Sequence, residues 1–399
     1  MSKDLLSRVL GRDASLFAED IATHQSHLRE IITGSRVLIL GAAGSIGQAF
    51  VKQVVGYQPA LLHLVDPSEN NLVELVRDLR SSVLSVPEAF KTVAIDLGSS
   101  SFDHFLKAFG PYDHILNFAA LKHVRSERDP YSLMRMLNVN VRFLDQLLAG
   151  LRDHPPQRFF SVSSDKAVRP QSLMGASKAL MEKVLWDHSD RIHTTTARFA
   201  NVAFSDGSLL HGFRYRLEKG QPLAAPNDVR RYFISHQEAG ELCLLACFLG
   251  ERRDILFPAQ GEALPPGTFS EIAELFLESQ GYRPRHFESA EAARAFAETR
   301  DPSSREWPCF FSPSDTTGEK PLEEFYEPGE RIDLDRYRTI GVLHQPIFKE
   351  REALREALEV IAEINESTDW FIPALVEAVR LAVPGLQREE KAHDLDQKM

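Results

Sequence analysis

The amino-acid sequence predicts an α/β fold: a Rossmann-type doubly wound parallel sheet, with a smaller C-terminal substrate-binding lobe and an N-terminal helical extension. Three observations lead to this prediction. Residues 36–47 read as an apolar strand, a glycine-rich turn and the start of a helix. A second apolar strand ends in Asp66, about 20 residues after the last of these glycines. Strands then alternate with helical segments as far as residue 203, as a parallel sheet with crossover helices requires.

The glycine-rich turn has the spacing G-x-x-G-x-x-G, with Gly41, Gly44 and Gly47. Glycines at these positions let the backbone approach a pyrophosphate, and the helix that begins at Ser45 and Ile46 supplies N–H donors and the positive end of its dipole. We therefore expect these five residues to contact a dinucleotide.

Asp66 stands where a dinucleotide-binding fold places a carboxylate. Such a group accepts hydrogen bonds from the adenosine ribose hydroxyls and repels a 2′-phosphate, so NAD is expected in preference to NADP. Asp66 could instead cap the helix over residues 68–79, because Asp-Pro-Ser begins helices well.

The composition limits the classes of partner. Hydrophobic residues make up 43% of the 399 positions and charged residues 26%, as in ordinary globular proteins. A net charge of −11 argues against nucleic acid as the main partner, since phosphate binding needs clustered Lys and Arg. Neither the 3 cysteines nor the 14 histidines have metal-ligand spacing, so no metal is predicted.

No apolar run approaches the ~20 residues that span a bilayer, and the first residues lack the apolar core of a signal peptide. We expect a cytoplasmic protein with no membrane span. A reducing compartment also suits the three cysteines, of which Cys243 and Cys247 lie on an apolar helix and are expected in the core.

The chain divides into four predicted segments. Residues 1–33 form a helical extension that could cover the active site, build a dimer contact or be the remnant of a linker that tethers relatives to a membrane domain. Residues 34–203 form the dinucleotide-binding domain with the catalytic residues. Residues 204–347 form mainly the substrate-binding lobe, since Gly and Pro interrupt the strand-helix alternation there. Residues 348–399 form C-terminal helices and a polar tail.

The stretch from residue 161 to residue 178 reads S-V-S-S-D-K-A-V-R-P-Q-S-L-M-G-A-S-K. It continues an apolar strand, passes a Pro-containing turn and enters a helix on which Met174 and Lys178 are one turn apart. The carboxyl end of a parallel strand opens onto the ligand crevice. The residues expected to point at a substrate are Ser163, Ser164, Asp165 and Lys166.

This stretch resembles the active-site signature of the nucleotide-sugar 4,6-dehydratases, in the capsule and flagellin-sugar branch of the extended short-chain dehydrogenase/reductase superfamily. Within that branch it is most similar to the membrane-anchored UDP-N-acetylglucosamine 4,6-dehydratases, whose soluble half also has Met where the superfamily usually has Tyr. The resemblance implies an NAD-dependent lyase that converts a UDP-N-acetylhexosamine, with UDP-N-acetylglucosamine expected, into a 4-keto-6-deoxy sugar nucleotide for polysaccharide synthesis.

The resemblance also implies roles for the signature residues. Dehydration requires oxidation at C4, elimination of water across C5 and C6, and return of the hydride to C6. Lys166 would take the C5 proton, Asp165 would protonate the departing C6 hydroxyl, and Lys178 would bind the nicotinamide ribose. Met174 cannot abstract a proton, so deprotonation of O4 is left to Asp165, to Ser164 as a relay, or to water.

These residues also have simpler interpretations. Asp165 could stabilise the turn through side-chain hydrogen bonds, with Lys166 in solvent. Met174 and Lys178 could be one core and one surface residue of an ordinary helix.

Other positions take expected roles from the same resemblance. Small residues after the fourth strand leave room for the nicotinamide ribose, and Asn138 is expected to brace the site through backbone contacts. Arg230 replaces a family Thr and is either an extra contact or a surface charge. The remaining positions are Asp96 and Leu97 near the adenine, Ala119 and Ala120 near the ribose, and Lys122, Asn201, Arg231 and Glu319 near the substrate.

Three alternatives stay open. A nucleotide-sugar 4-epimerase oxidises and reduces C4 without elimination, and would have no use for the Asp165–Lys166 pair. A GDP-sugar 4,6-dehydratase is compatible with Thr316 and Thr317, which replace the Arg and Pro of the family segment. A catalytically inactive dinucleotide sensor would bind the cofactor without turning over a sugar. By analogy with the superfamily we expect a homo-oligomer, a dimer or larger.

Overall fold

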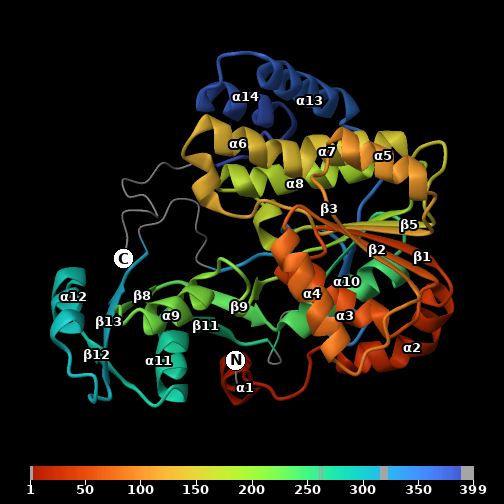
Figure 1. The fold of residues 1–399 in the computed structure, drawn as a ribbon. Coiled ribbons are helices and arrows are strands. Elements are labelled where there is room, and N and C mark those ends of the chain that lie inside the picture. Colours follow the sequence, from red (N-terminus) through yellow and green to blue (C-terminus); the bar gives the residue numbers. More distant parts are fainter. Residues whose placement is uncertain (1–2, 260, 262–263, 315–321, 388–399) are drawn as a thin grey trace.

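The computed structural model describes residues 3–259, 261, 264–314 and 322–387. It confirms the predicted α/β fold. Nine strands form one sheet in the order β14-β15-β10-β6-β5-β4-β1-β2-β3, and the last seven of these run parallel (Figure 1). The parallel strands are β1 (Arg36–Leu40), β2 (Leu61–Asp66), β3 (Ala89–Ala94), β4 (His114–Asn117), β5 (Arg158–Val162), β6 (Thr194–Ala197) and β10 (Asp254–Pro258). The antiparallel edge is formed by β14 (Ile332–Asp333) and β15 (Ile340–His344).

Helices cover both faces of this sheet (Figure 1). One face carries α2 (Ala18–Ile32), α3 (Ser45–Val55), α4 (Glu69–Ser81) and α10 (His236–Leu249). The other carries α5 (Ser100–Phe109), α6 (Pro130–Leu137), a π-helical turn (Asn138–Arg142), α7 (Phe143–Gly150) and α8 (Leu173–His188). A C-terminal pair, α13 (Arg351–Glu366) and α14 (Ile372–Ala382), packs over α8. No helix within the described ranges is both long and apolar enough to cross a bilayer.

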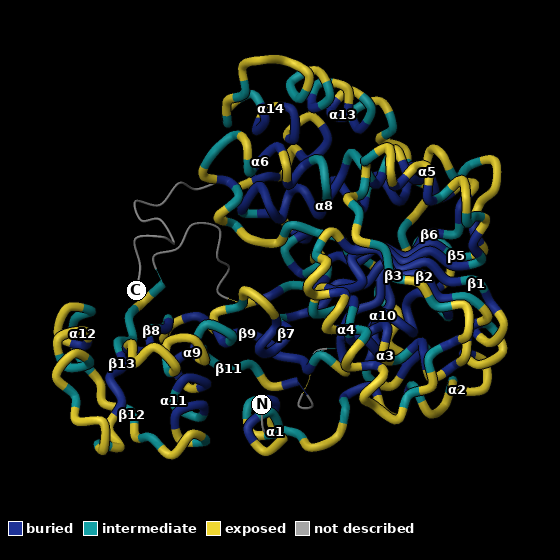
Figure 2. The backbone as a smooth tube through the Cα atoms, viewed as in Figure 1, coloured by how far each residue is buried: buried dark blue, intermediate teal, exposed yellow. Residues whose placement is uncertain are grey.

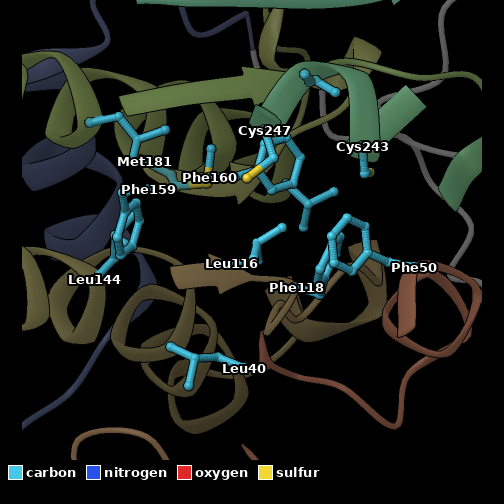
Figure 3. Close-up of a cluster of buried hydrophobic side chains, with 14 of the residues drawn as sticks. Leu40, Phe50, Leu116, Phe118, Leu144, Phe159, Phe160, Met181, Cys243 and Cys247 are labelled. Atoms are coloured by element: carbon cyan, nitrogen blue, oxygen red, sulfur yellow. The ribbon is translucent and has the colours of Figure 1, made fainter. Parts of the chain in front are cut away.

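The main core lies between the sheet and these helices (Figure 3). Neighbouring residues of a strand point to opposite faces, yet Phe159 and Phe160 are both fully buried because helices cover each face. Cys243 and Cys247 of α10 are also fully buried beside Phe50 and Phe118, as free thiols. The apolar strands of the sequence are therefore the central strands of the sheet.

A second, smaller core forms the lobe. It contains Phe213, Phe276 and Trp307, and two small sheets frame it, ordered β11-β9-β7 and β12-β13-β8. Figure 2 shows that the outer end of the lobe, at α12, is mostly exposed. The lobe elements are β7 (Asn201–Val202), α9 (Leu209–Glu218), β8 (Leu223–Pro226), β9 (Arg230–Ile234), β11 (Pro266–Thr268), α11 (Phe269–Ser279), β12 (Arg283–His286), α12 (Ala290–Thr299) and β13 (Glu306–Ser312).

The main domain takes in more of the chain than the segment 34–203. The elements α10, β10 and β15 lie within residues 204–347, yet β10 pairs with β6 and α10 packs on α3. The physical reason is that the chain leaves the sheet after β6 to build part of the lobe, then returns to add another strand beside it. Strand-helix alternation along the sequence does not reveal such a return.

The N-terminal extension joins the two parts of the molecule. Its first helix, α1 (Lys3–Leu10), packs on α11 in the lobe, and α2 packs on α10. Between them the Arg12 guanidinium donates to both carboxylate oxygens of Glu238, at 2.7 and 2.8 Å, and to the Phe233 carbonyl at 3.1 Å. The described contacts therefore show a brace within the chain, a role that the sequence analysis did not include, and they test none of the three roles that it left open.

Candidate active site

The glycine-rich turn connects β1 to α3, and two of its glycines are required by the protein itself. Gly41 has a φ of +69°, and a Cβ there would lie under 3.0 Å from the backbone nitrogen of Ala119. A Cβ on Gly47 would come equally close to the carbonyl oxygen of Gly41. These two glycines let the turn, the helix and the loop after β4 pack together.

Gly44 is different, because the chain leaves room beside it. Its φ of −74° suits any residue, and the nearest atom to a Cβ there would be the Gly41 carbonyl oxygen at an ordinary 3.6 Å. Gly44 precedes Ser45, whose Oγ accepts a hydrogen bond from the Asp206 N–H at 2.9 Å, and Ile46 packs against the core. The open backbone at the amino end of α3 fits a pyrophosphate.

Asp66 ends β2 directly beside this turn. Its carboxylate accepts hydrogen bonds from the N–H groups of Ala43, at 3.0 Å, and Ser68, at 2.9 Å. Burial raises the pKa of Asp66, and these two N–H donors oppose that shift. The helix cap is Ser68, whose Oγ accepts from the Asn71 N–H, so the interpretation of Asp66 as the N-cap is wrong.

The other predicted cofactor residues follow the ends of two further strands, β3 beside β2 and β4 beside β1. Asp96 is exposed after β3, its carbonyl accepts from Ser99, and Leu97 packs partly on the core. After β4, the Ala119 N–H donates to Asn117 Oδ1 at 3.1 Å, and Ala120 follows at the same sheet edge. The structure thus brings the predicted cofactor residues to one edge of the sheet.

An asparagine braces the loop after β4, but it is Asn140 and not Asn138. The Asn140 side chain accepts from the Leu121 N–H at 2.8 Å and donates to the Leu121 carbonyl and to Ser177 Oγ, both at 2.9 Å. Asn138 instead donates to Asn365 on α13. The expectation for Asn138 is wrong because residues 138–142 form a π-helical turn, which changes the direction in which each side chain points.

The catalytic candidates follow β5. Ser164 caps a short 3₁₀ turn, Asp165–Ala167, by accepting from the Lys166 N–H at 3.2 Å. The Asp165 carboxylate is 5% exposed, and its Oδ1 lies 3.4 Å from the Lys166 ammonium, whose side chain is 39% exposed. An acid and a base therefore stand together where a substrate could reach them.

Ser163 does not point toward the substrate side. Its buried hydroxyl donates to Glu182 Oε1 at 2.6 Å, so the expectation that it faces a ligand is wrong. Alternate residues of a strand share a face, and Ser161 also faces α8, where it contacts Met181.

Lys178 is a buried residue, so its interpretation as a surface lysine is wrong. Its ammonium donates to the Val162 carbonyl at 2.9 Å. Burial lowers the pKa of Lys178 to about 8, and the Glu182 carboxylate one turn away opposes that shift. Met174 is also buried, and its N–H donates to Glu127 Oε1 at 2.8 Å. The helix α8 is thus held against the end of β5.

A buried ion pair lies behind these residues. The Arg198 guanidinium donates to both oxygens of Glu182, at 2.9 and 2.6 Å, and its third contact is the Phe325 carbonyl at 2.8 Å. Both side chains are at most 7% exposed. The pair links β6, α8 and the segment around Phe325.

The predicted substrate residues converge on a carboxylate that sequence reasoning missed, Glu323. The Asn201 amide and the Tyr232 N–H both donate to it, and the Arg231 Nε lies 3.5 Å from its Oε1. No local pattern separates Glu323 from its neighbour Glu324, because only the fold brings it to β7 and β9.

The other substrate candidates fall in different places. Lys122 is exposed to solvent but surrounded by protein on most sides. Burial of the ammonium lowers the pKa of Lys122. The negative charge of Asp206 opposes this shift, and the positive charge of Lys166 adds to it. Arg230 is an exposed residue that bonds the Pro266 carbonyl at 3.2 Å. Glu319, with the whole segment 315–321, lies outside the described residues.

A cavity of about 710 Å³ lies beside the 3₁₀ turn, and Ala167 of that turn contributes to its lining. Arg169 and Pro170, residues of α8, and the stretch before α13 contribute to its lining. None of the predicted cofactor residues lines it. Among its charged lining residues, Arg198 pairs with Glu182 and Lys183 pairs with Glu350.

Comparison with known proteins adds a family match. A family model described as polysaccharide biosynthesis protein matches residues 37–298. The chain is 29% identical over 259 residues to an uncharacterized membrane protein, MJ1061, of Methanocaldococcus jannaschii, covering 63% of this chain and 74% of that protein. It is 27% identical over 236 residues to the capsular polysaccharide biosynthesis protein CapD of Staphylococcus aureus, covering 58% of this chain but only 39% of that protein.

Other matches are to an epimerase and to solved structures. The chain is 24% identical over 294 residues to the UDP-glucose 4-epimerase of Rickettsia prowazekii, covering 66% of this chain and 80% of the epimerase. The X-ray structure of Pen from Bacillus thuringiensis superposes with a TM-score of 0.60 at 18% identity, covering 79% and 89% of the two chains. Bordetella bronchiseptica WbmF in complex with NADH gives 0.51 at 14% identity, covering 89% and 98%. These structures share the fold.

Proposed function

The chain belongs to the polysaccharide biosynthesis protein family, and on that premise we propose that it is an NAD-dependent nucleotide-sugar 4,6-dehydratase. Its proposed substrate is a UDP-N-acetylhexosamine, with UDP-N-acetylglucosamine first, and its product is the 4-keto-6-deoxy sugar nucleotide. The observation that carries the proposal is the Asp165–Lys166 pair, 3.4 Å apart at the carboxyl end of β5 and followed on α8 by the buried Lys178.

The cofactor site fits a dinucleotide. The open backbone at Gly44 has room for a pyrophosphate, and the Asp66 carboxylate, which accepts from the Ala43 N–H of the turn, is proposed to favour NAD over NADP. Asp96, Leu97, Ala119 and Ala120 lie at the same sheet edge, and WbmF, which shares the fold, was solved with NADH. When bound, NAD would take up hydride from C4 and return it to C6.

The residues of the chain supply the proton transfers. Lys166, partly exposed, is proposed to take the C5 proton, which oxidation at C4 makes acidic, and Asp165 to protonate the departing C6 hydroxyl. Lys178 would hold the nicotinamide ribose, and its lowered pKa follows from its burial. Met174 has no ionisable group, so α8 offers no acceptor for the O4 proton at that position.

Substrate binding is proposed for the groups on the lobe side. The Asn201 amide and the Arg231 guanidinium, both beside Glu323, are proposed to donate to the diphosphate, and Lys122 is proposed to contact the sugar or its phosphates. Glu319 remains a prediction. The same holds for a cytoplasmic location and for self-association into a dimer or larger homo-oligomer.

The deciding experiment incubates the purified protein with UDP-N-acetylglucosamine and NAD in deuterated water, and follows the product by mass spectrometry and NMR. A product lighter by one water, with deuterium at C5, supports the proposal. An unchanged mass with inverted C4 supports a 4-epimerase. A GDP-hexose run in parallel tests the other nucleotide, and no turnover of any nucleotide sugar supports the inactive sensor.

The 4-epimerase is the second candidate because the chain matches a UDP-glucose 4-epimerase over 80% of that enzyme's length. An epimerase also oxidises C4 and would use the same cofactor site. It performs no elimination, so it gives no reason for an acid and a base beside each other at Asp165 and Lys166. Dehydration is therefore preferred.

The two kinds of glycine predict different effects of adding a methyl group. Gly44→Ala should lower stability by about 1 kcal/mol or less, from a weaker helix cap, yet weaken NAD binding by about tenfold or more. Gly47→Ala should lower the unfolding free energy by about 3 kcal/mol, because its Cβ meets the Gly41 carbonyl. Thermal unfolding and calorimetric titration with NAD measure both effects. Equal NAD affinity in Gly44→Ala and the wild type would show that the pyrophosphate does not bind at this turn.

A further inference from the structure

The N-terminal extension contributes side chains to both hydrophobic cores of the molecule. Leu5 and Leu10 of α1 belong to the core of the lobe, and Leu16 and Phe17 belong to the main core. All four are at most 8% exposed. Residues 11–15, called the connection below, join the two anchored ends (Figure 1). The extension therefore ties the lobe to the main domain on a path separate from β7 and β9.

The connection is held by Arg12, whose guanidinium reaches three elements. Its Nε and Nη2 donate to the two carboxylate oxygens of Glu238 in α10, at 2.7 and 2.8 Å. Its Nη2 also donates to the Phe233 carbonyl in β9 at 3.1 Å, and its Nη1 donates to the Leu10 carbonyl at the end of α1 at 3.0 Å. The Arg12 side chain is 13% exposed and that of Glu238 is 1% exposed. One buried cation thus joins α1, β9 and α10.

Glu238 is itself held from both ends of the contact. Its carboxylate accepts from the Leu16 N–H after the connection and from the Ser235 N–H at the cap of α10, both at 2.7 Å. Burial alone would raise the pKa of Glu238, but the hydrogen bonds and charge of Arg12, together with these two N–H donors, lower it. The carboxylate is therefore ionised at neutral pH and paired with Arg12.

The strand at this junction carries the substrate candidates. β9 contains Arg231, and its Phe233 is the register partner of Asn201 in β7. The helix α10, which follows β9, packs closely on α3, since a Cβ on Gly240 would lie under 3.0 Å from the α3 backbone. The helix α3 begins at the glycine-rich turn. Arg12 therefore binds β9 to the helix that is fixed against the cofactor side of the protein.

We propose that Arg12 is a positioning residue for substrate binding, which holds β9 on α10 so that Arg231 and Asn201 are placed to bind the diphosphate of a UDP-sugar. This inference rests on the proposed function, which takes those two residues as diphosphate ligands. Parts of a chain that meet at an internal interface commonly move relative to each other. A site that must be ordered on binding loses affinity, whereas a site that is already ordered does not.

The test is calorimetric titration of Arg12→Met and of the wild type, as full-length proteins, with UDP and with NAD. The Kd for UDP should rise about tenfold, because β9 loses its tie. The Kd for NAD should change less than about twofold, since the proposed cofactor residues lie on the main sheet. With UDP-N-acetylglucosamine, KM should rise by a similar factor, about tenfold, and kcat should change less. Arg12→Lys should lose part of the UDP affinity, because an ammonium keeps the charge without the planar fork of donors.

A double variant separates this role from a loss of stability. Arg12→Met leaves Glu238 buried with an uncompensated charge, so it should unfold at a lower temperature than the wild type. Arg12→Met with Glu238→Gln removes that charge, and Gln can still accept from the Ser235 and Leu16 N–H groups. Its unfolding temperature should return toward that of the wild type, while its affinity for UDP should stay weak. Recovery of UDP affinity together with stability would overturn the inference.

Arg8→Met is the matched control on the same extension. Arg8 lies on α1 and pairs with Glu278 of α11 at 2.7 Å, with both side chains about half exposed. This variant should bind UDP and NAD as the wild type does. The inference is wrong if Arg12→Met binds UDP with wild-type affinity, if it loses NAD affinity to the same extent, or if Arg8→Met shows the same loss of UDP affinity.

Hydrogen exchange followed by mass spectrometry adds a measurement without a sugar nucleotide. In Arg12→Met with Glu238→Gln, the amides of β9 should exchange faster than in the wild type, while those of β1 and β2 should not change. Unchanged exchange in β9 would refute the tie. If the wild type binds UDP but turns over no nucleotide sugar, the proposed function fails and the UDP titrations still decide the role of Arg12. A wild type that does not bind UDP would contradict this inference as well.

Discussion

Replacement of Asp165 by Asn, or of Lys166 by Met, is expected to lower the rate of dehydration by about 10²–10⁴-fold each. Asn keeps the shape of Asp165 but cannot release a proton to the C6 hydroxyl. Met keeps the length of Lys166 but cannot take the C5 proton. Both changes alter the ionisable pair and leave the 3₁₀ turn and its cap at Ser164 in place.

The two variants should fail at different steps. Lys166→Met should still allow oxidation at C4, so the absorbance of the reduced nicotinamide should accumulate after substrate is mixed with NAD-loaded enzyme. If Asp165 is the acceptor for the O4 proton, this absorbance should appear more slowly in Asp165→Asn, whereas an unchanged rate assigns that proton to Ser164 or water. Single-turnover stopped-flow absorbance and product mass measure the two steps.

Lys183→Met is the control for the lysine replacement. Lys183 lies on α8, as Lys178 does, but its ammonium pairs with Glu350 on the cavity side. Its rate should match that of the wild type. If both Asp165→Asn and Lys166→Met dehydrated the substrate at the wild-type rate, the assignment of Asp165 as the acid and Lys166 as the base would be wrong.

Replacement of Arg198 by Met is expected to cost about 3–5 kcal/mol of unfolding free energy. The change leaves the Glu182 carboxylate buried at 6% exposure with its charge uncompensated, and it also removes the donor to the Phe325 carbonyl. Glu182 also accepts the hydrogen bond from the Ser163 hydroxyl, so the destabilisation should extend to the end of β5. Urea unfolding followed by circular dichroism measures the effect.

A double variant separates the charge from the packing. Glu182→Leu with Arg198→Met removes both charges, so it should be more stable than Arg198→Met alone. Arg285→Met provides a surface comparison, since its pair with Glu306 is about half exposed on both sides and should contribute about 1 kcal/mol or less. If the double variant were less stable than Arg198→Met, the uncompensated charge would not be the cause.

Local sequence patterns predicted the parts of the site that lie within one element or one turn. The glycine spacing from Gly41 to Gly47 and the adjacent Asp165 and Lys166 depend on the geometry of a strand, a turn and a helix, which a few residues specify. The structure brings these groups to one edge of the sheet. Their catalytic roles still come from a resemblance and await experiment.

Errors arose where a side chain's direction depends on its partners. The π-helical turn at 138–142 gives the bracing contacts to Asn140, and π-helical turns are too rare to predict from pattern. Ser163 follows a strand, but the buried Glu182 draws its hydroxyl toward α8. In both cases a buried polar group finds a hydrogen-bond partner that sequence proximity does not reveal.

The sequence by itself determined the α/β class, the glycine-rich turn and the neighbouring acid and base, because each is set by short-range geometry. Only the tertiary structure decided that β10 returns to the main sheet and that the Asn201 amide and the Tyr232 N–H meet the distant carboxylate of Glu323. The physical reason is that burial of apolar surface folds distant segments together, and the electrostatic environment of a buried carboxyl is created by that folding.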